Sequence, residues 1–204
     1  PGDSRHRWLA PALSAPVLAA MAAYGTVRLL QAPTAYVDNV RLRIMQPNLQ
    51  QDEKFNYSQK QQVMSRYLAL SDRPSDPQSP GLRGVTLLIW PESAFPFFLT
   101  REPDALAQIA ALLPAETVLI TGAIRAPEAA ANAPVTRAYN SIYVIDHHGS
   151  ILSVYDKVHL VPFGEFIPTG FGWFVRQMQI PLGDFVRGSV HQPSIEWQGQ
   201  RLAP

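Results

Sequence analysis

The apolar positions of this chain form one long run near the start and a series of shorter runs after it. The long run covers residues 9–27 and contains no charged residue. Beyond Gln31, short apolar runs with strand character alternate with stretches of helical periodicity and with Pro- and Ser-rich loops. The strand-like runs are residues 40–45, 84–89, 117–123, 139–146 and 150–155. Helices are expected over residues 56–69 and 103–113.

Turn signals in the later part of the chain predict two hairpins. His147, His148 and Gly149 separate the runs 139–146 and 150–155, and residues 195–202 are typical of a strand, a Gly turn and a return strand. Neighbouring histidines on a turn point to opposite sides, and no Asp, Glu or Cys with ligand spacing accompanies this pair. The pair therefore indicates a hairpin tip rather than a metal site. Strands, helices and late hairpins in this order predict an α/β sandwich.

The long apolar run has the length of a membrane-spanning helix. Arg5 and Arg7 precede it and Arg28 follows it. The run is rich in Ala and contains Pro11 and Pro16, which weaken the preference for membrane insertion. A buried core helix and the apolar part of a secretory signal therefore remain alternatives.

The overall composition excludes one class of function. The chain has 204 residues, of which 47% are hydrophobic and 16% charged, and its formal net charge is +1. No cluster of Lys and Arg is interleaved with aromatic residues, so no nucleic-acid partner is expected. The absence of cysteine fits an oxidising compartment without proving one.

Two polar motifs each follow a strand-like run. Trp-Pro-Glu-Ser-Ala occupies residues 90–94, and Tyr-Asp-Lys-Val-His-Leu-Val-Pro-Phe-Gly-Glu-Phe-Ile-Pro occupies residues 155–168. Strand ends deliver side chains into clefts, so we expect Glu92 and Lys157 in one cleft. A carboxylate that takes a proton from a nucleophile and an ammonium that stabilises a tetrahedral oxyanion suit acyl transfer.

Each of these residues also has a plainer interpretation. Glu92 between Pro91 and Ser93 fits a solvent-exposed loop carboxylate or a helix cap, and Lys157 fits an exposed lysine after a strand. Apolar neighbours favour partial burial of Lys157 beside a carboxylate, either Glu92 or Glu165. For Glu165 the alternative is a structural salt bridge to an arginine such as Arg187, and His159 is expected to be structural.

Together the two motifs resemble the nitrilase, or carbon-nitrogen hydrolase, superfamily, whose members use a Glu, a Lys and a Cys in that chain order. The string Lys-x-His-Leu-Val-Pro-Phe-Gly-Glu is similar to the membrane branch of that superfamily, the apolipoprotein N-acyltransferases. The resemblance implies that Glu92 is the general base, Lys157 the oxyanion-stabilising lysine and Glu165 a second active-site carboxylate. It also implies an incomplete nitrilase-like αββα sandwich over residues 38–204, preceded by the last transmembrane helix within residues 1–30.

The same resemblance implies an activity and a location. The expected reaction moves an acyl chain from a phospholipid, through a thioester enzyme, to the N-terminal diacylglyceryl-cysteine of apolipoproteins, with no metal or cofactor. Arg5 and Arg7 would mark the cytoplasmic end of the helix, which places the catalytic domain on the periplasmic face of the bacterial inner membrane. The cysteine of the family is expected in a Cys-Tyr-Glu sequence beyond Pro204. The chain, which begins with Pro1 rather than Met, is therefore expected to be a truncated and inactive piece.

Three aromatic residues are expected to bind substrate, namely Phe55, Phe163 and Phe166. Phe55 stands where the resemblance leads us to expect a Trp, and it either lines an acyl pocket or packs against the following helix. The loop 163–173 is rich in aromatic residues, Gly and Pro. It is interpreted as a lid that dips toward lipid, with a long loop folded over the core as the alternative.

Two other functions share parts of this pattern. A soluble nitrilase-type amidase has the Glu and the Lys but passes the acyl group to water, and it needs neither the Val-Pro-Phe-Gly-Glu continuation nor the apolar run. A catalytically inactive, membrane-anchored binding module is the third interpretation, favoured if the gene has no cysteine after this segment.

Overall fold

The computed structural model describes residues 8–33, 35–50, 56–75, 77, 79–126, 138–167, 185–197 and 200–202. The chain divides into two compact units, Pro1–Asp38 and Asn39–Pro204. Each unit is described by itself.

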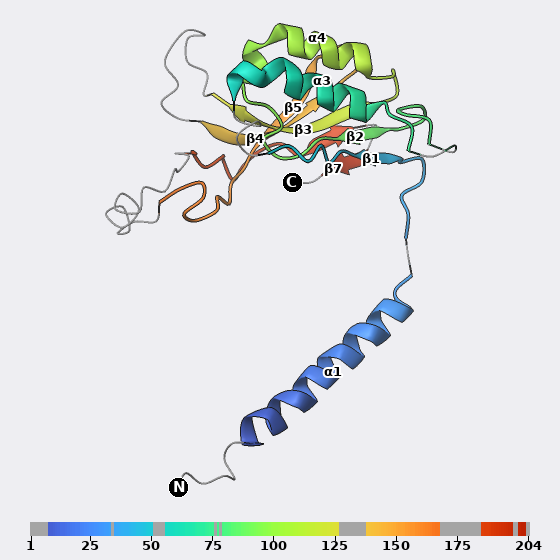
Figure 1. Ribbon diagram of the computed structural model, residues 1–204, viewed down its shortest axis with the longest axis vertical. Helices are drawn as coiled ribbons and strands as arrows, with labels where there is room; N and C mark the ends of the chain where they lie inside the picture. The colour runs from blue at the N-terminus through green and yellow to red at the C-terminus, as the bar shows by residue number, and fades with distance from the viewer. Residues whose placement is uncertain are drawn as a thin grey trace. The chain divides into compact units, whose positions relative to one another are not determined.

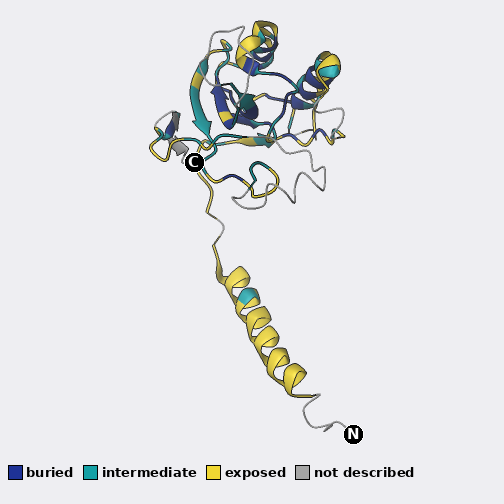
Figure 2. Ribbon diagram, turned by 90° about the vertical axis from the view of Figure 1, so that its left-hand side faces the viewer, coloured by how far each residue is buried: buried dark blue, intermediate teal, exposed yellow. Residues whose placement is uncertain are grey.

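The first unit is built around one helix, α1 (Leu9–Gln31). It extends the apolar run by one turn and ends where the backbone N–H of Ala32 donates to the carbonyl of Arg28. None of its residues is buried (Figure 2). At about 1.5 Å per residue, its 23 residues are long enough to cross a bilayer. A signal sequence near an N-terminus can also be long and apolar enough to meet this criterion.

The second unit is built on a five-stranded mixed sheet in the order β1-β2-β3-β4-β5 (Figure 1). The strands are β1 (Leu42–Ile44), β2 (Leu87–Ile89), β3 (Val118–Arg125), β4 (Tyr139–Ile145) and β5 (Ile151–Asp156). The first three run parallel, and β3, β4 and β5 are antiparallel neighbours. All five expected strands are confirmed, and the turn 147–149 joins β4 to β5.

Two helices cover one face of this sheet, α3 (Lys60–Ser71) and α4 (Pro103–Leu112) (Figure 1). Each is preceded by a short 3-10 turn, η2 (Tyr57–Gln59) or η3 (Leu99–Arg101), so the helix expected from residue 56 begins a few residues later. Between helices and sheet lies the main core, in which the rings of Tyr67, Trp90 and Phe95 contact one another. The Trp90 indole N–H donates to the buried Ser71 hydroxyl at 2.8 Å, which satisfies both polar groups.

The opposite face of the sheet is covered differently. Here the expected C-terminal hairpin forms β6 (Ile195–Trp197) and β7 (Gln200–Leu202). Ile195 is buried in a second, smaller cluster with Leu87, Val118 and Val144, which project from β2, β3 and β4. The two clusters thus lie on opposite faces of the sheet, as strand alternation requires. Further along the second face is the cavity that holds the expected site.

Candidate active site

Glu92 lies in the segment after β2, and hydrogen bonds to β3 on both sides of Glu92 fix this segment. The backbone N–H of Trp90 donates to the carbonyl of Ile120, and that of Ala94 donates to the carbonyl of Gly122, both at 2.9 Å. A side chain at Gly122 would place its Cβ 2.6 Å from the Cα of Glu92. Glycine at this position therefore allows the Glu92 segment to lie directly against β3.

Lys157 follows β5 and its main chain is hydrogen-bonded on both sides. Its N–H donates to the carbonyl of Asn140 at 2.8 Å, and its carbonyl accepts from Gly188 at 3.0 Å. Antiparallel pairing with β4 thus continues one residue beyond Asp156. The fixed main chain sets the direction in which the long lysine side chain extends.

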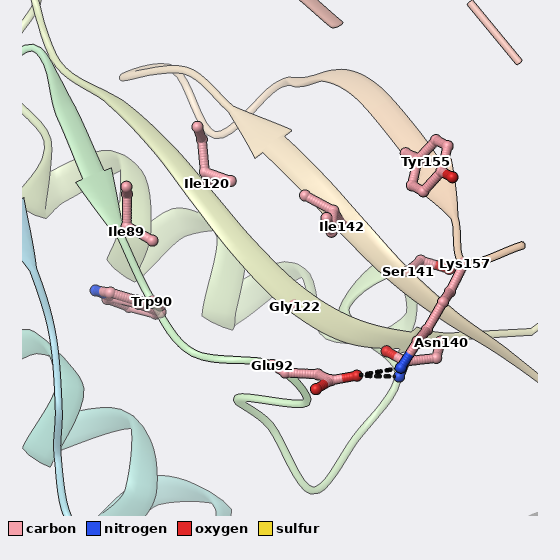
Figure 3. Close-up of a pocket in the computed structure, with 10 residues that line it drawn as sticks. All are labelled: Ile89, Trp90, Glu92, Ile120, Gly122, Asn140, Ser141, Ile142, Tyr155 and Lys157. Atoms are coloured by element: carbon pink, nitrogen blue, oxygen red, sulfur yellow. Dashed lines mark hydrogen bonds and ion pairs between the residues drawn. The ribbon is translucent and has the colours of Figure 1, made fainter. Parts of the chain in front are cut away.

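The side chains of Glu92, Lys157 and Glu165 meet in one cluster. The Lys157 Nζ atom lies 3.2 Å from Glu92 Oε1 and 3.0 Å from Glu165 Oε1. The Asn140 amide donates to the same two oxygens, at 2.5 Å and 2.7 Å respectively. Figure 3 shows Glu92, Asn140 and Lys157 converging at one end of the cavity. One ammonium and one amide thus hold two carboxylates together, and the cluster carries one excess negative charge.

The two carboxylates differ in exposure. The side chain of Glu92 is 63% exposed, while that of Glu165 is 12% exposed. Glu165 also accepts the N–H of Val161 on its other oxygen at 2.7 Å, in a turn where Phe163 has a φ of 63°. Glu165 is therefore the internal carboxylate of the pair and Glu92 the accessible one.

Burial and charge act in opposite directions on the pKa values in this cluster. Partial burial would raise the pKa of Glu165, but hydrogen bonds from Val161, Asn140 and Lys157 outweigh it and lower the pKa. Partial burial would likewise lower the pKa of Lys157, but Glu165 and Glu92 outweigh it and raise the pKa. Lysine and internal glutamate are therefore held in their charged forms.

Three members of the cluster, Glu92, Asn140 and Lys157, line one end of a cavity of about 410 Å³ (Figure 3). The lining is largely apolar, with isoleucines from β2, β3 and β4. The lining residues are Ile89, Trp90, Glu92, Ile120, Gly122, Asn140, Ser141, Ile142, Tyr155 and Lys157. An apolar cavity with a few convergent polar groups at one end is typical of a small-molecule or acyl-binding site.

The other expected site residues are placed as follows. Phe163 and Phe166 lie in the turn that carries Glu165, and neither belongs to the lining of this cavity. Phe163 is 42% exposed. Phe55 and the part of the expected lid from Pro168 onward lie outside the described residues. The substrate-binding roles of the three phenylalanines stay predictions.

The structure shows which cation Glu165 pairs with and places one further residue beside it. The carboxylate of Glu165 pairs with Lys157, whereas the Arg187 guanidinium lies 5.4 Å from the ring centre of Phe166. Asn140 was not expected in the site. Its only signal is an amide on the same face of a strand as Ile142 and Val144, where it is 6% exposed. A buried amide needs partners, and here the two carboxylates supply them.

Within the part of the chain that the structure describes, no three His, Cys, Asp or Glu side chains form a group able to hold a metal ion. The positive charge of the site comes from Lys157.

Comparison with known proteins identifies the family of the chain. The family model "Carbon-nitrogen hydrolase" matches residues 40–193. The chain is 66% identical over 166 residues to an apolipoprotein N-acyltransferase of Rhodopseudomonas palustris, covering 81% of this chain and 31% of that protein. It is 58% identical over 195 residues to the protein of the same name from Bradyrhizobium diazoefficiens, covering 92% and 36%.

The chain thus spans about a third of the length of these curated relatives. Among solved structures, an amidase from Nesterenkonia sp. is 16% identical with a TM-score of 0.49, covering 84% of this chain and 57% of that chain. The family match extends from the start of the sheet to the segment before β6 and includes Glu92, Lys157 and Glu165. The chain belongs to the carbon-nitrogen hydrolase family.

Proposed function

We propose that this chain carries the acyl-transfer site of an apolipoprotein N-acyltransferase. The observation that carries the proposal is the Lys157 ammonium held within 3.2 Å of two carboxylates at one end of an apolar cavity. The name shared by the most similar curated relatives supports the same reaction. The acyl donor would be a phospholipid, and the acceptor would be the α-amine of a diacylglyceryl-cysteine at the N-terminus of an apolipoprotein.

The two carboxylates take different roles in this proposal. Glu92, the accessible one, accepts the proton of the attacking nucleophile and returns it to the leaving group. Glu165 keeps its negative charge and holds Lys157 protonated. The ammonium then stabilises the oxyanion that forms when the carbonyl carbon becomes tetrahedral.

The nucleophile in this proposal is a cysteine thiol outside these 204 residues, which contain none. In the first half-reaction the thiol proton moves to Glu92, and sulfur attacks the ester carbonyl. The lysophospholipid alkoxide leaves with that proton, which gives a thioester. In the second, the amine attacks the thioester, its proton moves to Glu92, and the thiol departs with it. These 204 residues alone are therefore expected to transfer no acyl group.

Membrane attachment through α1 completes the proposal. The helix is apolar, 23 residues long and exposed, and a phospholipid substrate requires access to a bilayer. Arg5 and Arg7 before the helix favour the cytoplasmic side for its start. The catalytic unit would then face the periplasm of the inner membrane.

Labelled acyl donor tests the proposal directly. The protein expressed from its whole gene is mixed with phospholipid carrying a labelled acyl chain, and the acyl-enzyme is trapped. A hydroxylamine-sensitive adduct that passes its label to a diacylglyceryl-cysteine peptide is the expected result. Release of the label only to water, with no transfer to the peptide, would contradict the transferase and indicate a hydrolase instead.

A further inference from the structure

The end of β5 is an edge of the sheet, and Lys157 extends from that edge. Beyond β5 the sheet has no sixth strand among the residues described. An unpaired edge leaves backbone N–H and C=O groups without partners and allows the main chain to move. A lysine with a flexible four-carbon side chain keeps its ammonium in place only if its Cα is fixed.

The segment 185–192, here called the strap, supplies partners along this edge. The N–H of Gly188 donates to the carbonyl of Lys157 at 3.0 Å, and the N–H of Phe185 donates to the carbonyl of Glu165 at 3.2 Å. The same segment therefore binds the main chain of the lysine and that of the internal glutamate. It links two residues of the site that come from different loops.

Gln192, the last residue of the strap, pairs with both main-chain groups of Asp156. Its Oε1 accepts the Asp156 N–H at 2.7 Å, and its Nε2 donates to the Asp156 carbonyl at 2.8 Å. The Gln192 amide thus makes the pair of main-chain hydrogen bonds that a neighbouring antiparallel strand would make to Asp156. Nε2 also donates to the carbonyl of Ser189 at 2.7 Å, which fixes the orientation of the amide.

The side chain of Asp156 is held as firmly as its main chain. Arg125 donates to both carboxylate oxygens, at 2.8 Å and 2.5 Å, and the Ser141 hydroxyl donates at 2.6 Å. A side chain at Gly188 would place its Cβ 2.2 Å from the Asp156 carbonyl oxygen, so the strap reaches this position only through glycine. Asp156, the residue before Lys157, is therefore held by Gln192 at its main chain, by Arg125 and Ser141 at its carboxylate, and by close packing of Gly188 against its carbonyl.

We propose that Gln192 is a positioning residue, which fixes Asp156 and thereby holds the Lys157 ammonium between Glu92 and Glu165. The proposal rests on the role proposed above for Lys157. Gln192 touches no reacting atom. It acts through the main chain, and a displacement of about 1 Å in a catalytic group lowers rates by about a hundredfold.

Two variants of Gln192 separate this role from simple packing. Gln192→Ala removes both hydrogen bonds to Asp156. Gln192→Glu keeps the acceptor but loses the donor while its carboxylate is ionised, and regains the donor when it is protonated. The matched control is His191→Ala, since the side chain of His191 is exposed on the same strap.

The first measurement is trace labelling of Lys157 with acetic anhydride in the protein expressed from its whole gene. We expect Gln192→Ala to increase labelling about three- to tenfold at fixed pH, because the pKa of an ammonium falls when it is drawn away from its carboxylates, and only the neutral amine reacts. His191→Ala should match the wild-type protein. Labelling of Gln192→Ala equal to that of His191→Ala, with unchanged turnover, would overturn the proposal.

The second measurement is the rate of acyl transfer. Gln192→Ala should lower kcat about tenfold to a hundredfold and leave KM for the phospholipid unchanged, as expected for a displaced transition-state group. The kcat of Gln192→Glu relative to wild type should rise as the pH falls from 8 to 5.5, and that of Gln192→Ala should not. A ratio for Gln192→Glu that stays flat over this range would also count against positioning.

The two measurements also separate the two proposals. Altered labelling of Lys157 with no acyl transfer by any variant, including wild type, would reject the proposed function and retain the positioning role. Acyl transfer by the wild-type protein, with labelling and turnover of Gln192→Ala equal to those of His191→Ala, would retain the proposed function and reject the positioning role. If Gln192→Ala fails to fold, the comparison rests on Gln192→Glu.

Discussion

Among the residues that the structure describes, Lys60 and Lys157 are both paired with glutamates, and the surroundings of the two pairs differ. Lys60 at the start of α3 lies 2.9 Å and 3.0 Å from the two oxygens of Glu102, just before α4. The Tyr57 hydroxyl donates to Glu102 at 2.7 Å and accepts from Lys60 at 2.8 Å. The hydrogen bonds that Lys60 donates to Tyr57 and Glu102 raise the pKa of Lys60, and the pKa of Lys157 is raised as well. A raised lysine pKa therefore does not by itself distinguish an active site.

The Lys60 and Lys157 clusters differ in their charge balance and in their position in the fold. Lys60 has one carboxylate partner in this cluster, so the charges cancel, and the cluster joins η2 to the start of α4. Lys157 has two carboxylate partners, and the 63% exposed one, Glu92, lines the end of an apolar cavity together with Lys157. The candidate site therefore differs from the Lys60 cluster by an accessible second carboxylate beside a cavity, and not by the Lys-Glu pair that both clusters contain.

Removing each lysine gives the largest expected contrast. Lys157→Ala should lower kcat for acyl transfer by at least about 10²–10³-fold, the loss found when one oxyanion-stabilising group is removed. Lys60→Ala should leave kcat close to wild type and lower Tm slightly, because it removes a partly exposed ion pair whose residues do not line the cavity. Kinetics and thermal unfolding of the protein expressed from its whole gene measure both effects. A comparable loss of kcat in Lys60→Ala would remove the distinction between the two clusters.

Removing the uncharged donor of each cluster gives a smaller contrast. Asn140→Ala takes one hydrogen bond from each carboxylate of the site, and kcat should fall about tenfold to a hundredfold, since a hydrogen bond to a charged group contributes about 1.5–3 kcal/mol. Tyr57→Phe removes the corresponding hydroxyl from the Lys60 cluster and should not change kcat. If Asn140→Ala transferred acyl groups at the wild-type rate, the Asn140 amide would not be needed to hold the carboxylates in place.

The sequence predicted the charged members of the site and missed the neutral ones. Glu92 and Lys157 each stand directly after an apolar run, so local pattern and motif were enough to place them at strand ends. Asn140 lies 48 residues from Glu92 along the chain, and only the register of β4 against β3 and β5 brings its amide between the carboxylates. Gln192 is likewise 36 residues from Asp156. Register and loop paths follow from packing of the whole sheet, which no local pattern encodes.

The smallest contrast is in the pH dependence of stability. The pKa of Glu165 is lowered by its three donors despite burial, and the pKa of Glu102 is lowered by Tyr57 and Lys60. A depressed folded-state pKa gives stability that is present above the unfolded value of about 4.3 and is lost as the pH falls through the folded value. Glu165→Gln and Glu102→Gln should therefore each reduce the fall in Tm below about pH 4.3.

Activity then separates these two glutamates. At neutral pH, Glu165→Gln should also lower kcat, because Lys157 loses its internal counter-charge, whereas Glu102→Gln should leave kcat unchanged. Thermal unfolding from pH 3 to pH 7, with kcat measured at pH 7, provides the comparison. Equal kcat in the two variants would mean that the internal carboxylate beside Lys157 serves stability alone, and that Glu92 is sufficient to keep the lysine in place.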